Sequence, residues 1–283
     1  MIIIADSGGS KIDWRFIKSD KSIDQAHSPG FNPYYQPIDH LQQIITTELI
    51  PKATEPVRKI FYYGTGVSSE KNQEMIRSVF LQAFPQAVIE VGWDLLAAAR
   101  ALCGHEAGIA CILGTGSNSC LYDGRQIVGN VANLGWILAD EGSGAYIGKQ
   151  FIKDYFRQKM PTELAKQFHA RFPWSREEVL EKVYQQERPS AFLASFTRFI
   201  FQHLKEPYCY NLIYKSFSDF YENNVMGYPD YQKYPVHFTG SVAFYFNDIL
   251  RQAAMDKGIF VKNILEGPIA GLTLYHQKDL NEL

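Results

Sequence analysis

Two short glycine-rich turns, at residues 6–10 and 114–118, limit the folds open to this chain of 283 residues. Each turn follows a short apolar run and precedes a second run rich in strand-forming residues. The plan of strand, polar glycine turn and antiparallel strand therefore occurs twice, about 108 residues apart. We interpret the repeat as a structural duplication in which each copy carries one turn.

The rest of the chain alternates strands with helices, which is typical of α/β proteins. Strands are expected at residues 1–5, 13–17, 60–63, 88–91, 109–113, 119–122, 127–131, 236–239 and 259–261. Helices are expected at residues 38–49, 72–84, 94–102, 242–257 and 268–278, and another begins near Gly144. A capping box at residues 175–178 and Pro189 mark two further helix starts. This order predicts two α/β domains, with the best boundary at residues 103–108.

Composition and charge exclude several classes of protein. The formal net charge is -2 and hydrophobic residues make up 46%, so neither a nucleic-acid partner nor disorder is expected. No apolar run approaches the roughly 20 residues of a membrane helix, and residues 1–5 are too few for a signal peptide. The cysteines form no C-x-x-C pair and are expected to be reduced thiols in a cytoplasmic protein. They are Cys103, Cys111, Cys120 and Cys209.

Both turns have the composition of phosphate-binding loops. Consecutive backbone N–H groups bind phosphate oxygens well, and glycine allows a close approach. The glycines are Gly8, Gly9, Gly114 and Gly116, and hydroxyl groups come from Ser10, Thr115 and Ser117. Either turn alone could be an ordinary hairpin turn. A Walker loop is absent, and a Rossmann fingerprint would lead into a helix rather than a strand. One turn in each domain instead suits a nucleotide clamped between two domains.

Four segments resemble motifs of a known superfamily. Residues 6–11 with Trp14 resemble the first phosphate motif of the actin/hexokinase/Hsp70-like ATPases, residues 113–118 the second, and residues 238–243 the adenosine motif. Within that superfamily, residues 134–144 resemble N-acetylglucosamine kinases and the related BadF/BadG/BcrA/BcrD ATPase family. The motifs stand in matching order over nearly the whole chain.

The resemblance implies a fold and a division of the chain. It implies two RNase H-like (actin-like ATPase) α/β domains that flank a cleft for nucleotide and sugar. We expect the N-terminal domain at residues 1–107, completed by a returning helix at residues 272–283. The C-terminal domain is expected at residues 108–271. The small residues around Gly271 favour tight helix packing without a ligand.

Asp94 is the candidate catalytic base. It follows the strand at residues 88–91 and begins a helix, which is where α/β sheets gather ligands. Position alone favours an ordinary helix N-cap, because aspartate is common there. The resemblance assigns residues 92–98 to the kinase segment whose aspartate accepts the proton of the sugar hydroxyl. Both roles could hold together.

The cofactors implied are ATP and Mg²⁺. Asp6 ends the first strand and is the candidate metal residue, acting through water, although it could simply satisfy local N–H groups. Lys11 could neutralise phosphate charge or be an ordinary exposed lysine. The full set of candidate ATP-binding residues is Asp6, Gly8, Gly9, Ser10, Lys11, Gly114, Thr115, Gly116, Gly240 and Ser241.

The sugar site rests on the resemblance. The candidate substrate residues are Asn32, Asp94, Asn118, Gly135, Trp136 and Asp140. Asn32 before Pro33 could equally be a turn pair, and acids at Asp140 and Glu141 would be favoured at a helix start without any function. The glycines at positions 135, 142, 144 and 148 suggest that the backbone comes close to a ligand.

We therefore predict an ATP-dependent sugar kinase that transfers the γ-phosphate to a hydroxyl, the 6-OH, of N-acetylglucosamine or a related amino sugar. One alternative is a BadF-type ATPase that drives a partner protein, but such activators hold an iron–sulfur cluster with cysteines that have no counterpart motif here. Another is a non-catalytic sugar sensor, which would normally carry a basic helix-turn-helix segment. The aromatic stretch at residues 151–234 is assigned to packing or to a homodimer interface.

Overall fold

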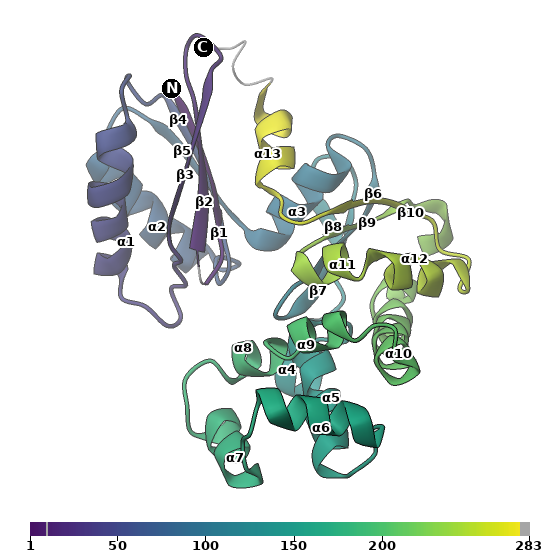
Figure 1. Ribbon diagram of the computed structural model, residues 1–283. Coiled ribbons are helices and arrows are strands. Elements are labelled where there is room, and N and C mark those ends of the chain that lie inside the picture. The colour runs from purple at the N-terminus through teal and green to yellow at the C-terminus, as the bar shows by residue number, and fades with distance from the viewer. Residues whose placement is uncertain (10, 278–283) are drawn as a thin grey trace. The chain divides into compact units, whose positions relative to one another are not determined.

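The computed structural model describes residues 1–9 and 11–277, and the chain falls into two compact units (Figure 1). The N-terminal unit consists of Met1–His105, Gly124–Gln126 and the described residues from Gly267 onward. The C-terminal unit consists of Glu106–Asp123 and Ile127–Glu266. Ser10, a candidate phosphate ligand, lies outside the described residues.

The N-terminal unit is built on a five-stranded sheet in the order β3-β2-β1-β4-β5. The strands are β1 (Ile2–Ser7), β2 (Lys11–Ile17), β3 (Ile23–Pro29), β4 (Lys59–Gly64) and β5 (Val88–Trp93). Strands β1, β2 and β3 pair antiparallel in turn, whereas β1, β4 and β5 are parallel. The carboxyl ends of the three parallel strands therefore meet at one edge of the sheet.

Helices cover both faces of this sheet (Figure 1). They are α1 (Ile38–Ile44), α2 (Glu70–Ala83), α3 (Asp94–Cys103) and α13 (Ile269–Tyr275). Alternate residues of β1 enter different hydrophobic clusters: Ile3 packs with Ile76 of α2, and Ile4 packs with Leu272 of α13. Strand β1 is apolar on both faces because both faces are covered.

The last described helix packs tightly against α3. A Cβ atom at Gly271 would lie 2.4 Å from the carbonyl oxygen of Ala101, so no side chain fits at this position. This contact confirms the close packing predicted for Gly271. The helix spans Ile269–Tyr275, inside the predicted residues 268–278, of which residue 278 lies outside the described part of the chain.

The C-terminal unit repeats the same sheet. Its order is β10-β9-β6-β7-β8, with β6, β7 and β8 antiparallel in turn and β6, β9 and β10 parallel. The strands are β6 (Gly108–Leu113), β7 (Ser117–Tyr122), β8 (Ile127–Gly129), β9 (Val236–Thr239) and β10 (Val261–Leu265). The first strand of each unit thus occupies the same place, which confirms the predicted duplication at the level of topology.

The helical part of the C-terminal unit encloses an aromatic core. Its α-helices are α4 (Gly135–Leu138), α5 (Gly144–Phe156), α6 (Thr162–Arg171), α7 (Arg176–Tyr184), α8 (Pro189–Ala194), α9 (Thr197–Gln202), α10 (Pro207–Asn223), α11 (Ser241–Tyr245) and α12 (Asn247–Met255). Phe151, Phe168, Phe196 and Phe199 are buried together in its core. Much of the aromatic stretch is therefore accounted for by packing. The capping box of α7 and the proline at the start of α8 are as predicted.

The structure differs from the predicted elements in several places, in helix type as well as in extent. Strand β3 was missed because it is an edge strand in which only Ala26 and Ser28 are buried, so it lacks an apolar pattern. The helix predicted at residues 242–257 is two helices separated at Phe246. The helix predicted at residues 38–49 continues beyond α1 as a π-helix, Ile45–Leu49. In the described residues, no helix has the length and apolar character needed to cross a membrane.

Candidate active site

The carboxyl edge of the N-terminal sheet gathers the candidate catalytic groups. The parallel register places Ser7 level with Gly64, and Gly64 level with Trp93. Asp6 therefore stands one residue before the end of its strand, while Asp94 comes directly after β5. Thr65 follows β4, and its backbone N–H donates to the carbonyl oxygen of Ser7 at 3.0 Å. Three neighbouring strands thus bring two carboxylates and a hydroxyl to one edge.

Asp94 is the first residue of α3, and the N-cap is Trp93, so the prediction of Asp94 as the N-cap was wrong. Its carboxylate accepts the backbone N–H of Leu95 at 2.8 Å and a hydrogen bond from the Thr65 side chain. Burial raises the pKa of Asp94 to about 6, against the opposing effect of these two hydrogen bonds. This pKa suits a general base, which works best near the operating pH.

Asp6 is a partly buried carboxylate in a crowded, negative environment. Burial, followed by the charges of Asp13 and Asp94, raises its pKa to about 7. The charge of Lys11 acts in the opposite direction. A carboxylate whose ionised form is this disfavoured gains from a nearby cation.

The donor set around Asp6 fits Mg²⁺ better than a metal held by a protein cage. In the described residues there is no group of three or more His, Cys, Asp or Glu side chains placed to hold a metal ion. Mg²⁺ commonly uses one or two carboxylates and fills its remaining positions with water and phosphate oxygens. Asp6 can supply one such carboxylate, and the surplus of negative charge around it favours a bound cation.

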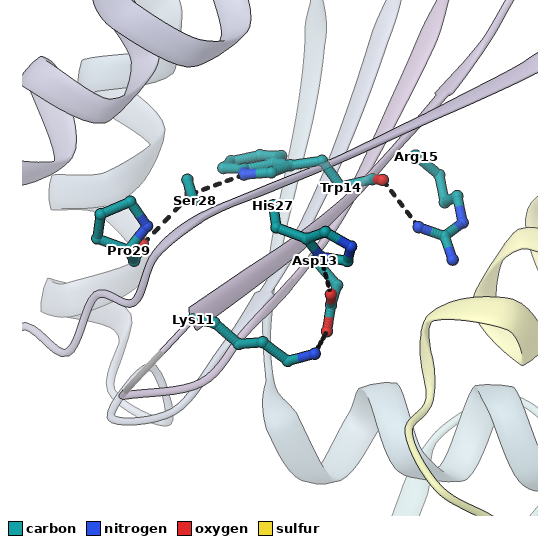
Figure 2. Close-up of polar contacts among 7 residues, drawn as sticks. All are labelled: Lys11, Asp13, Trp14, Arg15, His27, Ser28 and Pro29. Carbon is teal, nitrogen blue, oxygen red and sulfur yellow. Dashed lines mark hydrogen bonds and ion pairs between the residues drawn. The ribbon is translucent and has the colours of Figure 1, made fainter.

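Lys11 belongs to a polar cluster on β2 and β3 that the sequence did not predict (Figure 2). Its ammonium lies 3.0 Å from one carboxylate oxygen of Asp13, and the other carboxylate oxygen bonds Nδ1 of His27. Trp14, which follows Asp13 in the chain, points to the other face of the sheet, where its indole N–H donates to Ser28 at 2.9 Å. Lys11 is therefore paired with Asp13, although its side chain is largely exposed.

The first glycine turn is open. Gly8 and Gly9 are exposed, and a Cβ atom at Gly9 would meet no atom within 4 Å. The backbone N–H of Gly8 donates to the carbonyl oxygen of Lys11 at 2.9 Å, so it is engaged within the turn. Below the turn, the hydroxyl of Tyr62 donates to Ser7 at 2.8 Å. The strand end that leads into the turn is thus buried, whereas Gly8 and Gly9 are accessible.

Asn32 lies beside the loop that follows β4. Its side-chain oxygen accepts the backbone N–H of Tyr34 at 3.0 Å, as in the turn considered as its alternative role. A Cβ atom at Gly66 would lie 2.6 Å from the same oxygen, and Gly66 has a φ of 74°. Since Gly66 follows Thr65, Asn32 is near the group that bonds Asp94. The turn contact and a sugar contact remain compatible.

The second glycine turn, in the C-terminal unit, is packed. The backbone N–H of Gly114 donates to the carbonyl oxygen of Gly116 at 3.0 Å. The carbonyl oxygens of Gly114 and Thr115 accept the N–H groups of Gly144 and Ala145, at 2.8 and 3.0 Å. Because these donors belong to the first turn of α5, the start of that helix is bound directly to the glycine turn.

Asp140 fixes the other side of this turn. It is buried, has a φ of 60°, and accepts the backbone N–H of Ser117. A Cβ atom at Gly116 would lie 2.9 Å from its carboxylate, so Gly116 makes room for Asp140. Burial raises the pKa of Asp140. The alternative role as a helix-start acid was wrong, because α5 is capped by Ser143 instead.

The glycines around this loop have different causes. Side chains at Gly142, Gly144 and Gly148 would meet Phe220, Ala194 and Leu193, the last at 1.9 Å from a backbone oxygen. Packing between helices therefore explains these three, and the idea that all of the glycines mark a ligand was wrong. Gly135 is different: it has a φ of 71° and a Cβ atom there would meet nothing within 4 Å.

Amide side chains link the 130–136 segment to β7. Asn130 donates to the side chain of Asn118 at 3.1 Å and to the carbonyl oxygen of Ser119. Asn133 donates to the carbonyl oxygen of Ser117 and accepts the N–H of Gly135, both at 2.8 Å. Asn130 and Asn133 were not predicted as site residues, although two asparagines stand within four residues of the sequence. These bonds attach the segment that contains Gly135 and Trp136 to the strand that contains Asn118.

Gly240 borders the second turn. A Cβ atom on it would lie 2.3 Å from the carbonyl oxygen of Leu113, and its φ is 113°. Its N–H donates to the carbonyl oxygen of Leu265 at 3.1 Å. Ser241, which is exposed, begins α11, a helix of only five residues. The long helix expected to favour a ligand here is therefore absent, and close packing by itself requires glycine at position 240.

Comparisons with known proteins agree with this architecture. A structure from Porphyromonas gingivalis, provisionally named an N-acetylglucosamine kinase, is 40% identical, covers 99% of both chains and has a TM-score of 0.93. A structure from Chromobacterium violaceum with the same provisional name is 17% identical, covers 98% of both chains and has a TM-score of 0.76. A ROK family glucokinase from Streptomyces griseus, solved with glucose and AMPPNP, is 15% identical over 97% of both chains, with a TM-score of 0.54. No protein-family model and no curated protein matches the chain.

The repeated sheet and these likenesses define the class as the α/β fold of actin-like ATPase sugar kinases. At 40% identity over 99% of its length, the chain belongs to the same family as the Porphyromonas gingivalis structure, the N-acetylglucosamine kinase-like ATPases. This confirms the resemblance carried by the glycine turns and by residues 134–144.

Proposed function

We propose that this protein is an ATP-dependent kinase that phosphorylates a hydroxyl, the 6-OH, of N-acetylglucosamine or a related amino sugar. The observation that carries the proposal is the pairing of Asp6 and Asp94 at one sheet edge, in a chain of this family. A phosphoryl transfer requires a base for the attacking hydroxyl and positive charge near the phosphates. Asp94 would supply the base, and Asp6 would hold the cation that supplies the positive charge.

Asp94 would act as the base. Its carboxylate is oriented by Thr65 and the N–H of Leu95, so it presents a fixed oxygen toward a bound hydroxyl. With a pKa of about 6 it is mostly ionised at neutral pH, yet basic enough to accept a proton as the hydroxyl attacks. Asn32, close to the Thr65–Gly66 loop, would bind another hydroxyl of the same sugar.

Asp6 would hold Mg²⁺, through water, with the phosphates of ATP. When bound, the ion supplies positive charge that offsets the charge developing on the phosphoryl oxygens. The candidate phosphate contacts are the first turn with Lys11 and the second turn at Thr115 and Gly116. Gly8 and Gly114 use their N–H groups within the turns, so their contribution would be the close approach that glycine permits.

The C-terminal unit would supply further contacts to the sugar. Asp140 is bonded to the second turn, Asn118 is bonded to Asn130, and Gly135 is bonded to Asn133. We propose that the two compact units are the two ATPase domains. We also propose that the protein acts in the cytoplasm, where its buried cysteines would stay reduced.

The two alternatives have weaker support. A BadF-type activator would need cysteines at an interface, whereas all four cysteines here are buried within their units. A sugar sensor would not need Asp94 at a pKa suited to a base. A kinase needs the base at Asp94 and requires no cysteine at an interface.

The test is a measurement of ADP release from Mg·ATP over a panel of N-acetylglucosamine, N-acetylmannosamine, N-acetylmuramic acid, glucosamine and glucose. We expect turnover with at least one N-acetyl amino sugar and the product to be its 6-phosphate. Steady ADP release without any sugar would favour the activator instead. Sugar binding without ADP release from any member of the panel would favour the sensor.

A further inference from the structure

The polar cluster on β2 and β3 lies in a row across the sheet. The register places Asp13 directly opposite Asp6 on one side and directly opposite His27 on the other. Residues directly opposite each other in a sheet point to the same face. Lys11, two residues before Asp13, shares that face. Asp6, Asp13 and His27 thus form a line across the sheet that ends at the candidate metal residue, and Lys11 lies beside this line on the same face.

Asp13 is the centre of this line. Its side chain is only 14% exposed, whereas those of Lys11 and His27 are 65% and 62% exposed. One carboxylate oxygen lies 3.0 Å from the ammonium of Lys11, and the other bonds Nδ1 of His27, as Figure 2 shows. A carboxylate engaged through both oxygens has a fixed orientation. It can therefore hold a long, flexible side chain in one place.

A purely structural role explains this arrangement poorly. Like charges placed directly opposite each other in a sheet are destabilising, and Asp13 stands opposite Asp6. Its charge also raises the pKa of Asp6, which disfavours the ionised form. An exposed Lys–Asp pair returns little stability for that cost. The pair makes sense if the position of the Lys11 ammonium matters.

Lys11 is close enough to Asp6 for its charge to lower the pKa of that carboxyl. An ammonium has three donors, so one bond to Asp13 leaves two for other acceptors. The ordering of a lysine side chain opposes binding unless it is already complete in the free protein. A salt bridge that places the ammonium beside the first turn would remove part of this cost.

We propose that Asp13 is a positioning residue for Lys11. Held by Asp13, which His27 orients in turn, the Lys11 ammonium stays beside Asp6 and the first glycine turn, ready to bind the phosphates of a nucleotide. The proposal rests on the proposed function, because it requires that this turn binds ATP. Asp13 itself does not contact the nucleotide.

The experiment is a double-mutant cycle on nucleotide affinity, with AMPPNP and Mg²⁺ as the probe and calorimetry as the readout. The variants are Lys11→Met, Asp13→Asn and the double substitution. We expect Asp13→Asn to weaken binding about three- to tenfold, Lys11→Met to weaken it at least as much, and the double variant to match Lys11→Met alone. In turnover assays KM for ATP should rise with little change in KM for the sugar.

A matched control lies at the other end of the same hairpin, where Lys18 pairs with Asp24 at 2.7 Å. Asp24→Asn removes a similar ion pair far from the turn and should leave AMPPNP affinity unchanged. His27→Gln, a milder change that tests the same orientation, should weaken binding less than Asp13→Asn. Thermal unfolding of each variant checks that it is folded.

Three results would overturn the proposal. They are unchanged or tighter AMPPNP binding by Asp13→Asn, additive effects in the double variant, and an equal loss in Asp24→Asn. Tighter binding in particular would mean that Asp13 only repels phosphate. A wild-type protein that binds no AMPPNP would instead overturn the proposed function, and this inference with it.

Discussion

The two glycine turns occupy the same place in sheets of the same order, yet their surroundings differ. The N-terminal turn is open and borders charged groups: Asp6, Asp13 and Asp94 gather there with one lysine. The C-terminal turn is packed against the start of α5 and against the carboxylate of Asp140. The fold therefore supplies a turn at each position. The residues just beyond the strand ends decide whether the turn borders candidate catalytic groups or is packed as part of the structure.

This difference makes distinct predictions for the two units. Substitutions at the N-terminal turn should change turnover and its pH dependence with little loss of stability. Substitutions at the C-terminal turn should lower stability and sugar affinity together.

The largest effect is expected at Asp94. Asp94→Asn keeps the shape and removes the base, so kcat should fall about 10²–10⁴-fold while ATP affinity stays nearly constant. Steady-state kinetics and AMPPNP calorimetry measure the two quantities separately. A variant that turns over at the full rate would show that Asp94 only begins α3.

The pH dependence of the wild type gives a second readout of the same residue. Burial raises the pKa of Asp94 to about 6, and the active form is the ionised one. Turnover should therefore be constant above this value and fall about tenfold per pH unit below it. Saturating Mg²⁺ is needed, because a bound cation keeps Asp6 ionised and leaves Asp94 as the titrating group. A kcat that stays flat down to pH 5 would contradict the assignment.

The ionisation of Asp6 should lower the free energy of unfolding, whereas the ionisation of Asp94 raises turnover. Burial raises the pKa of Asp6 from its ordinary value of 3.8 to about 7 in the folded protein, so folding disfavours the ionised form. The wild-type free energy of unfolding should therefore fall as pH rises from about 4 to about 7. Asp6→Asn removes that loss. Above pH 7 we expect it to be more stable by about 2 kcal/mol, less than the full shift implies because Asp6 is partly solvated.

Urea unfolding at pH 5 and pH 8, without Mg²⁺, measures this effect. Asp24→Asn is the control, since that carboxylate is exposed and paired with Lys18. If wild type and Asp6→Asn show the same pH slope, the carboxyl group of Asp6 is not held in an unfavourable ionised state. The carboxylates around the N-terminal turn would then not disfavour the ionised form of Asp6.

The sequence predicted the parts of the site that depend on local order. Asp6 lies near the end of one short apolar strand and Asp94 directly follows another, and parallel strands bring their carboxyl ends together. The Asp13–His27 pairing could not be predicted from the sequence, because β3 carries mostly exposed polar residues and has no apolar pattern that indicates a strand. The tight fit of Gly148 against Leu193 likewise depends on two helices 45 residues apart in the chain. Long-range packing of this kind leaves no local pattern.

The smallest effect separates the two turns most directly. Gly9→Ala and Gly116→Ala are the same chemical change, one in each turn. A Cβ atom at Gly9 would meet nothing within 4 Å, whereas at Gly116 it would lie 2.9 Å from the buried carboxylate of Asp140. Gly9→Ala should leave stability within about 0.5 kcal/mol of wild type. Gly116→Ala should lower it by about 1 kcal/mol, because Asp140 has little room to move.

The same pair should also differ in kinetics. Displacing Asp140 should raise KM for the sugar several-fold in Gly116→Ala, whereas Gly9→Ala should act on KM for ATP. Thermal unfolding and initial rates at varied sugar and varied ATP test both halves. If the two variants lose equal stability, or if both change only KM for ATP, the turns are functionally alike, and the contrast between a reactive turn and a shaping turn fails.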